Sequence, residues 1–139
     1  MNTHSPYRFF SLALIGVLAL AAGTAYAATT LDSGTWTKKS FSVKGTWSLV
    51  QDGDTVTVQL DRKFKTKKAP DLKLFLSPKP LNELNGKNAT AGSLRIAELK
   101  SHKGAQSYTL PAGTDLADYE TIIIHCEQYS KLWSGASLK

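Results

Sequence analysis

The sequence predicts an all-β fold, an antiparallel β-sandwich of about seven to eight short strands that forms a single domain. Short runs that alternate polar and apolar residues recur along residues 28–139, and Gly, Pro, Asp and Asn residues separate them. These residues contain no internal repeat and no stretch with the apolar spacing of an amphipathic helix. Their number suits one ordinary domain with one core.

Residues 1–27 have the pattern of a secretory signal peptide. Arg8 is their only charged residue, the apolar run 9–22 follows it, and Ala25-Tyr26-Ala27 is the small-x-small triplet that signal peptidase accepts. The apolar run is shorter than the roughly 18 to 20 residues that a membrane span needs. We therefore expect cleavage after Ala27 and an exported mature protein, either in a bacterial periplasm or secreted, with no transmembrane segment.

The first half of the mature sequence predicts a β-hairpin preceded by two brief strands. After a polar lead at 29–33, the brief strands are expected at 35–36 and 40–43. Two alternating runs, 45–50 and 55–60, then flank Asp52-Gly53, and an Asp-Gly pair in this position favours a tight hairpin turn. The apolar residues of the second run should face the core. They are Val56, Val58 and Leu60.

The run 62–68 carries five positive charges around Phe64. A basic run with an aromatic residue is also found at nucleic-acid interfaces, but an exported protein with one such run favours an exposed loop or edge strand instead. The 17 Lys and Arg residues of the sequence, less Arg8, exceed its 11 Asp and Glu residues by five. We therefore expect no nucleic-acid partner, and a surface for an acidic partner protein is the alternative use of this charge.

The second half predicts further strands and one long surface loop. Pro70 fixes a turn and Asp71 caps it, at the start of a strand over 72–77. Proline, glycine and asparagine residues make 78–92 the longest irregular stretch. Later strands are expected over the following ranges: 93–99 and 106–110, joined by a turn at 102–104, and 131–138 at the end of the chain.

The run 121–129 predicts a central strand, because three successive isoleucines favour an extended chain covered on both faces. With a period of two, Cys126 lies on the same face as Ile122 and Ile124, whereas His125 lies on the other face. Cys126 is the single cysteine of the sequence. It is either a small apolar core residue or, in an exported protein, a reactive thiol or a ligand.

Several kinds of site are excluded by composition. Residues 28–139 contain two histidines and no methionine, so the usual two-His, one-Cys, one-Met copper site cannot form. One cysteine rules out a Cys-rich zinc site and a dithiol pair. Neither a Gly-x-Ser-x-Gly motif nor a phosphate loop occurs. A redox or binding domain is therefore favoured over a turnover enzyme.

Taken in order, several short motifs resemble the DM-thirteen domain family over residues 34–138. The motifs are Gly45-Thr46, Phe64, Ala69-Pro70-Asp71-Leu72, Leu76-Ser77, Leu99-Lys100, Gly104-x-Gln106-x-Tyr108-x-x-Pro111 and Cys126-x-x-Tyr129-x-x-x-Trp133-x-x-Ala136-x-Leu138. Three residues depart from the family pattern: His125 replaces tryptophan, Lys131 an apolar residue and Ser134 glycine.

The resemblance implies an electron-transfer domain, which in bacteria often follows a signal peptide and in animals accompanies cytochrome-type modules. Cys126 matches the family's cysteine, and the resemblance implies that it acts as a redox thiol or as a ligand to a prosthetic group such as haem. We expect Cys126 at the rim of the sandwich, beneath Tyr129 and Trp133 and partly accessible to a small reagent, with these three residues as the contacts of a cofactor. The alternative is a non-catalytic binding module for an acidic partner, with Cys126 as a core residue.

Overall fold

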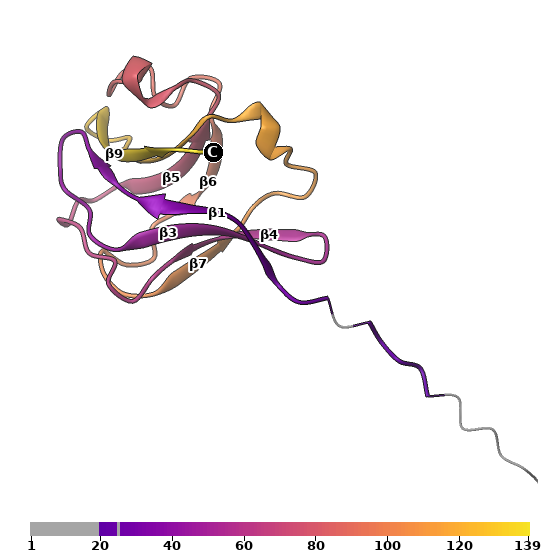
Figure 1. Ribbon diagram of the computed structural model, residues 1–139. Helices are drawn as coiled ribbons and strands as arrows, with labels where there is room; N and C mark the ends of the chain where they lie inside the picture. The colour runs from indigo at the N-terminus through magenta and orange to yellow at the C-terminus, as the bar shows by residue number, and fades with distance from the viewer. Residues whose placement is uncertain (1–19, 25) are drawn as a thin grey trace, which may run out of the picture.

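The computed structural model describes residues 20–24 and 26–139, which form nine strands in two antiparallel sheets (Figure 1). The predicted β-sandwich is therefore confirmed. The elements are β1 (Thr29–Thr35), β2 (Thr37–Lys38), β3 (Thr46–Asp52), β4 (Thr55–Leu60), β5 (Leu72–Ser77), the 3₁₀ turn η1 (Leu81–Glu83), β6 (Leu94–Glu98), β7 (Gln106–Thr109), the 3₁₀ turn η2 (Leu116–Asp118), β8 (Thr121–Cys126) and β9 (Lys131–Ser137).

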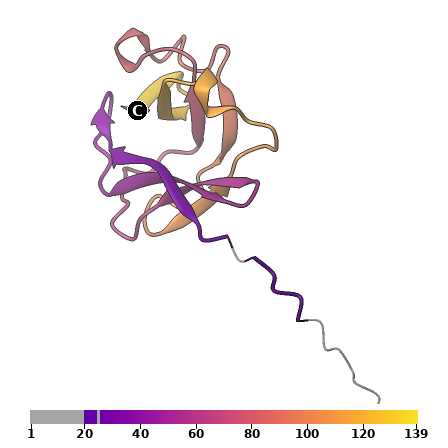
Figure 2. The ribbon, with the colours of Figure 1, turned by 45° about the vertical axis from the view of Figure 1, so that its right-hand side comes forward.

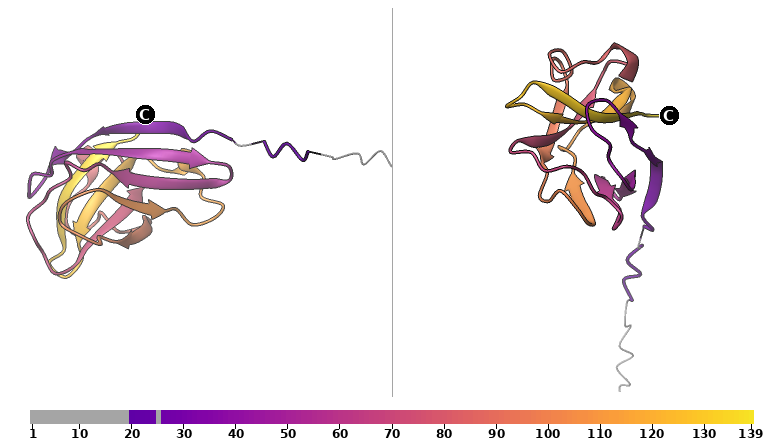
Figure 3. Two further views of the ribbon diagram at one scale, coloured as in Figure 1. Left: turned by 90° about the horizontal axis from the view of Figure 1, so that it is seen from below. Right: turned by 90° about the vertical axis from the view of Figure 1, so that its left-hand side faces the viewer.

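The two sheets differ in how completely they are buried. One has the strand order β1-β3-β4-β7 and the other the order β2-β9-β8-β5-β6, and Figure 3 shows them as two layers. Every residue of β5 and β8 is buried, whereas β1 is largely exposed. The second sheet therefore carries the most enclosed strands of the described chain.

The predicted hairpin is the pair β3 and β4. Asp52 pairs with Thr55, so Gly53 and Asp54 form the turn, and Gly53 has the positive φ of 58° that such a turn requires. Val58 and Leu60 are buried in the core, as the alternation predicts. The hairpin is thus fixed by its local sequence.

The strand β8 is the middle strand of its sheet, as predicted, with β5 on one side and β9 on the other. Its inward residues Ile122, Ile124 and Cys126 belong to the main core, and Ile123 belongs to a second, smaller cluster on the outer face. The expected assignment of residues to the two faces is confirmed.

The segment 78–92 covers the outer face of β8, and the description of it as a surface loop was therefore incomplete. Its residues Leu84 and Ala89 are buried with Phe75, Ile123 and Leu132. Figure 1 and Figure 2 show this segment, in salmon at the top, lying over β9 and β5. Because β5 and β8 are apolar on both faces, their outer face needs such a cover.

Two further expectations near the N-terminus were wrong, and the expected turn at 102–104 connects two strands that do not pair with each other. The polar lead 29–33 lies in the edge strand β1, which pairs with β3 through its backbone. The expected strand 40–43 is not a strand; instead the backbone N–H groups of Ser40 and Phe41 donate to the carbonyl oxygen of Trp133. The turn at 102–104 joins strands of different sheets, because β6 and β7 lie in different layers.

The basic run 62–68 forms a loop, as expected, but two of its residues point inward. Phe64 and Thr66 are buried, while the lysines between and after them are exposed. Lys65 forms isolated backbone bridges to Lys44 and to Lys103. This loop closes one end of the sandwich.

The expected signal peptide falls mostly outside the described residues, so its cleavage after Ala27 stays a prediction. The described residues before β1 are exposed and lead away from the sandwich (Figure 3). No described helix has the length and apolarity needed to cross a membrane.

Candidate functional site

Cys126 is the last residue of β8, and its thiol lies in the main core with no exposed surface. Its backbone pairs with Leu72 of β5 and with Lys131 of β9. The expectation of a partly accessible sulfur at the rim was therefore wrong. The strand expected over 121–129 ends at Cys126, because residues 127–130 form a turn, and the end of the sandwich is closed.

The closure results from an irregularity in β9. Ile124 pairs with Ser134 and His125 pairs with Leu132, so Trp133 is an extra residue between two paired positions. Trp133 is consequently buried in the same core as Cys126, and its indole N–H donates a 2.7 Å hydrogen bond to the hydroxyl of Thr66. This bond links β9 to the basic loop. The indole of Trp133 takes up the space in which an opening above the sulfur was expected.

Tyr129 does not join Cys126 and Trp133 in the core. It lies in the turn 127–130 between β8 and β9, where 57% of its surface is exposed. Of the three residues expected to surround a cofactor, two thus share the core and the third faces solvent.

Asp71 holds the turn 127–130 from the β5 side. Its carboxylate accepts a 3.0 Å hydrogen bond from the backbone N–H of Gln128, and its carbonyl accepts one from Glu127. Lys73 lies between two carboxylates, 2.9 Å from Asp71 Oδ1 and 2.6 Å from Glu127 Oε2. The expected local cap of the Pro70 turn is therefore replaced by bonds to a distant turn.

These contacts shift two titrations in opposite directions. The hydrogen bond from Lys73 lowers the pKa of Asp71, and the hydrogen bond to Glu127 raises the pKa of Lys73. Both shifts favour the charged forms of Asp71 and Lys73. The sequence reasoning missed the triad of Asp71, Lys73 and Glu127. The signal that could have revealed it is Lys73 inside the apolar strand 72–77, because a buried lysine needs a paired carboxylate.

His125 fixes the same turn from the outer face. Its Nε2 lies 2.8 Å from the carbonyl oxygen of Gly86, which can only accept, so Nε2 carries the hydrogen. Nδ1 then has no hydrogen-bond partner in the described part of the chain. An added Cβ on Gly86 would collide with the carbonyl oxygen of Ser130, so the two backbones lie in close contact.

The remaining motif residues have structural positions. Gly45 has φ of 86°, and a Cβ there would lie 2.6 Å from the backbone nitrogen of Phe64. The hydroxyl of buried Tyr108 accepts a 2.8 Å hydrogen bond from the backbone N–H of Lys100, and burial raises the pKa of Tyr108. Pro70 and Pro111 are exposed in the connections that precede β5 and follow β7.

A haem does not fit Cys126 in this arrangement. The sulfur has no exposed surface for an iron to approach, and His125 lies on the opposite face of the strand. Among the described residues no group of three or more His, Cys, Asp and Glu side chains is placed to hold a metal ion. Cys126 is a free cysteine and is buried.

A family model described as electron transfer DM13 matches residues 35–138. The chain belongs to the DM13 family. The comparison with curated proteins and the comparison with solved structures each found no significant match. The DM13 match extends from the end of β1 through β9, so Cys126, Asp71 and Trp133 all lie within it.

Proposed function

We propose that this DM13 domain works outside the cytoplasm as an electron-transfer domain, with Cys126 as a redox centre in the form of an uncoordinated thiol. Its family supports electron transfer, and the pattern of residues 1–27 supports export. The role proposed for Cys126 is supported by one observation: a route of aromatic rings leads from the core that holds this buried sulfur to the surface.

The route consists of Trp133 and Phe41. Trp133 shares the core with Cys126, and its ring is stacked on that of Phe41 with the two centroids 4.0 Å apart. Phe41 is partly exposed. An electron can therefore pass between the surface and the core through packed rings, and a partner need not touch the sulfur.

The chemistry is a one-electron step. An oxidised one-electron partner protein takes an electron from Cys126, the S–H bond breaks, the proton leaves to water during a transient opening of the core, and a thiyl radical remains on the sulfur. The reverse step restores the thiol. Burial suits this step because it keeps out a second thiol, which would form a disulfide, and peroxides, which would form a sulfenic acid.

The test is rapid oxidation of the purified protein by a one-electron oxidant, with detection of the radical by electron paramagnetic resonance in freeze-quenched samples. We expect a sulfur-centred radical in the wild type and none in Cys126→Ala. Circular dichroism checks that the variant remains folded. Equal oxidation and equal spectra for the two proteins would show that Cys126 is not the redox centre.

The second candidate is an extracytoplasmic binding module in which Cys126 only fills space. Complete burial of the sulfur beside isoleucine, leucine and tryptophan favours this candidate. It predicts that Cys126→Ala keeps every activity of the domain, whereas the redox proposal predicts loss of electron transfer with binding retained.

A further inference from the structure

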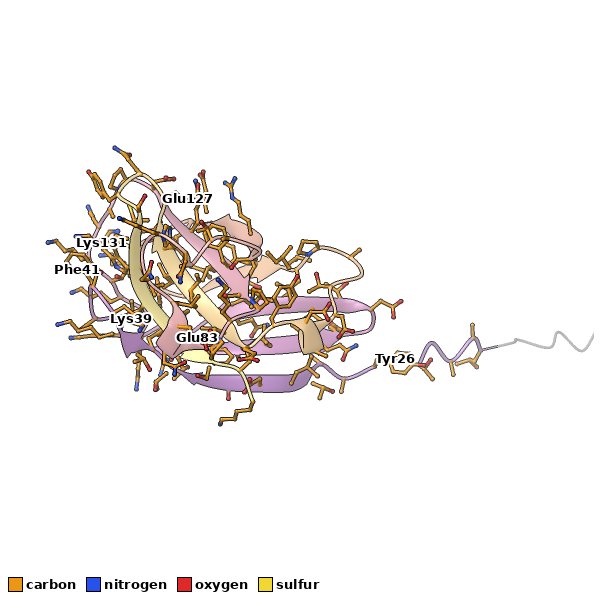
Figure 4. The ribbon with its side chains drawn as sticks, turned by 90° about the horizontal axis from the view of Figure 1, so that it is seen from above. Tyr26, Lys39, Phe41, Glu83, Glu127 and Lys131 are labelled. Atoms are coloured by element: carbon orange, nitrogen blue, oxygen red, sulfur yellow. The ribbon has the colours of Figure 1, made fainter. Side chains whose placement is uncertain are left out.

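Two lysines lie over the ring of Phe41, and a third lies nearby. The Nζ atoms of Lys67 and Lys131 lie 4.9 Å and 5.8 Å from the centroid of the Phe41 ring. Lys39 is two residues before Phe41, and Figure 4 shows Lys39, Phe41 and Lys131 together at the same end of the molecule. We call Lys39, Phe41, Lys67 and Lys131 the Phe41 patch.

A hollow opens beside the patch. It has a volume of about 360 Å³, and Lys39 and Lys131 are among the residues that line it. Ser40, Asn85 and Ser130 add polar groups to its wall. The hollow is therefore large enough for a side chain, and its lining suits a carboxylate.

The charges of the patch are not neutralised by the described part of the chain. The ion pairs there involve Lys73 and Arg95, and the nearby carboxylate of Glu127 is bound to Lys73. Like charges held close together repel one another, so an incoming anion gains from all three lysines.

We infer that the Phe41 patch is a docking surface for an acidic partner protein, one carboxylate of which enters the hollow between Lys39 and Lys131. The role of this partner in electron exchange rests on the proposed function. Lys131 is the backbone partner of Cys126 in β9, and Phe41 is stacked on Trp133, so the patch lies where the proposed route reaches the surface. Weak electron-transfer complexes use small, charged interfaces of this kind.

The test uses a polyglutamate peptide as the probe and the full mature protein. Binding is measured by calorimetry at several salt concentrations and mapped by amide chemical shifts. We expect shifts at Ser40, Gly86 and Ser130. Lys39→Gln/Lys131→Gln should weaken binding by roughly two- to thirtyfold, since each exposed ion pair is worth up to about fivefold.

The matched control is Lys79→Gln/Lys139→Gln, which removes the same charge at the far ends of β5 and β9. It should leave the affinity within about twofold, since distant exposed charges are screened by salt.

Equal weakening by both double variants would overturn the docking site. Binding to phosphatidylglycerol vesicles through Lys39 and Lys131, with no peptide binding, would replace the protein partner by a membrane surface. If the peptide binds but no Cys126 radical is detected in the wild type, only the redox role is refuted.

Discussion

Replacing Thr66 by Val tests whether the end of the sandwich controls access to Cys126. Valine has nearly the shape of threonine but cannot accept the 2.7 Å hydrogen bond from the indole of Trp133, which is only 3% exposed. A buried donor left without a partner costs about 1–3 kcal/mol. For a domain of this size the melting temperature should fall by about 4 °C per kcal/mol.

The assay is the rate of iodoacetamide labelling of native Cys126. Because the sulfur is completely buried, labelling requires an opening, and its rate follows the equilibrium population of the open form. If the opening breaks the Thr66–Trp133 bond, Thr66→Val should raise the rate by about 5- to 150-fold, the ratio that corresponds to 1–3 kcal/mol. Thr66→Ser retains the acceptor and serves as the control.

Two results would refute this reasoning. Rapid labelling of the wild-type protein under native conditions would show that the sulfur is not enclosed. An unchanged labelling rate in Thr66→Val, together with a lowered melting temperature, would show that the protein opens elsewhere, for example at the turn 127–130.

Three further experiments probe the site and its support. Cys126→Ser should destabilise the protein by about 1–3 kcal/mol more than Cys126→Ala, measured by urea denaturation, because it buries a hydroxyl among apolar side chains; equal stability would mean that the site is wetter than the structure shows. Gly45→Ala should cost well over about 1 kcal/mol and Gly53→Ala about 1 kcal/mol, because both have positive φ but only Gly45 is also crowded by Phe64; similar melting temperatures would contradict this difference. The pKa of Asp71 is lowered in the folded state, so its carboxylate stabilises the fold above the unfolded pKa of about 4, and this contribution is lost as the pH falls through the lower folded value. Asp71→Asn should therefore be less stable than wild type at neutral pH and approach it in acid, and a constant difference across the pH range would show that Asp71 titrates normally.

The elements that could be predicted are those whose signals are local. Asp52-Gly53 between alternating runs was sufficient for the β3–β4 hairpin, and three consecutive isoleucines were sufficient for the central strand β8. The edge strand β1 could not be found in this way, because its side chains are exposed and its pairing with β3 uses backbone groups. Predicting that the segment 78–92 covers Ile123 requires knowing that β5 and β8 are neighbours, and no local pattern contains this information.

The role of Cys126 as the functional residue stays a prediction, and the environment of Cys126 differs from the one expected. A single cysteine and the motif around it pointed to Cys126, and its face of the strand was assigned correctly. Its burial depends on Trp133 and Thr66, which are 67 residues apart, and on the extra residue in β9. Asp71 likewise bonds to Gln128, 57 residues away. Contacts over such separations follow from the packing of the sheets and leave no periodic signal in the sequence.

The burial of Cys126 narrows the chemistry through which a DM13 domain of this geometry can work. Disulfide exchange requires a thiol to approach the sulfur, oxidation to sulfenic acid requires a peroxide, and ligation requires a metal within bonding distance. Disulfide exchange and peroxide oxidation need exposed sulfur, and Cys126 has none. In the proposed function an electron passes through packed side chains: Trp133 lies in the same core cluster as Cys126 and packs on Phe41, and the surface beside Phe41 carries three lysines without ion-pair partners in the described chain. The closed core and the Phe41 patch are therefore parts of one arrangement, and in the proposed function the sulfur exchanges electrons while reagents are kept away.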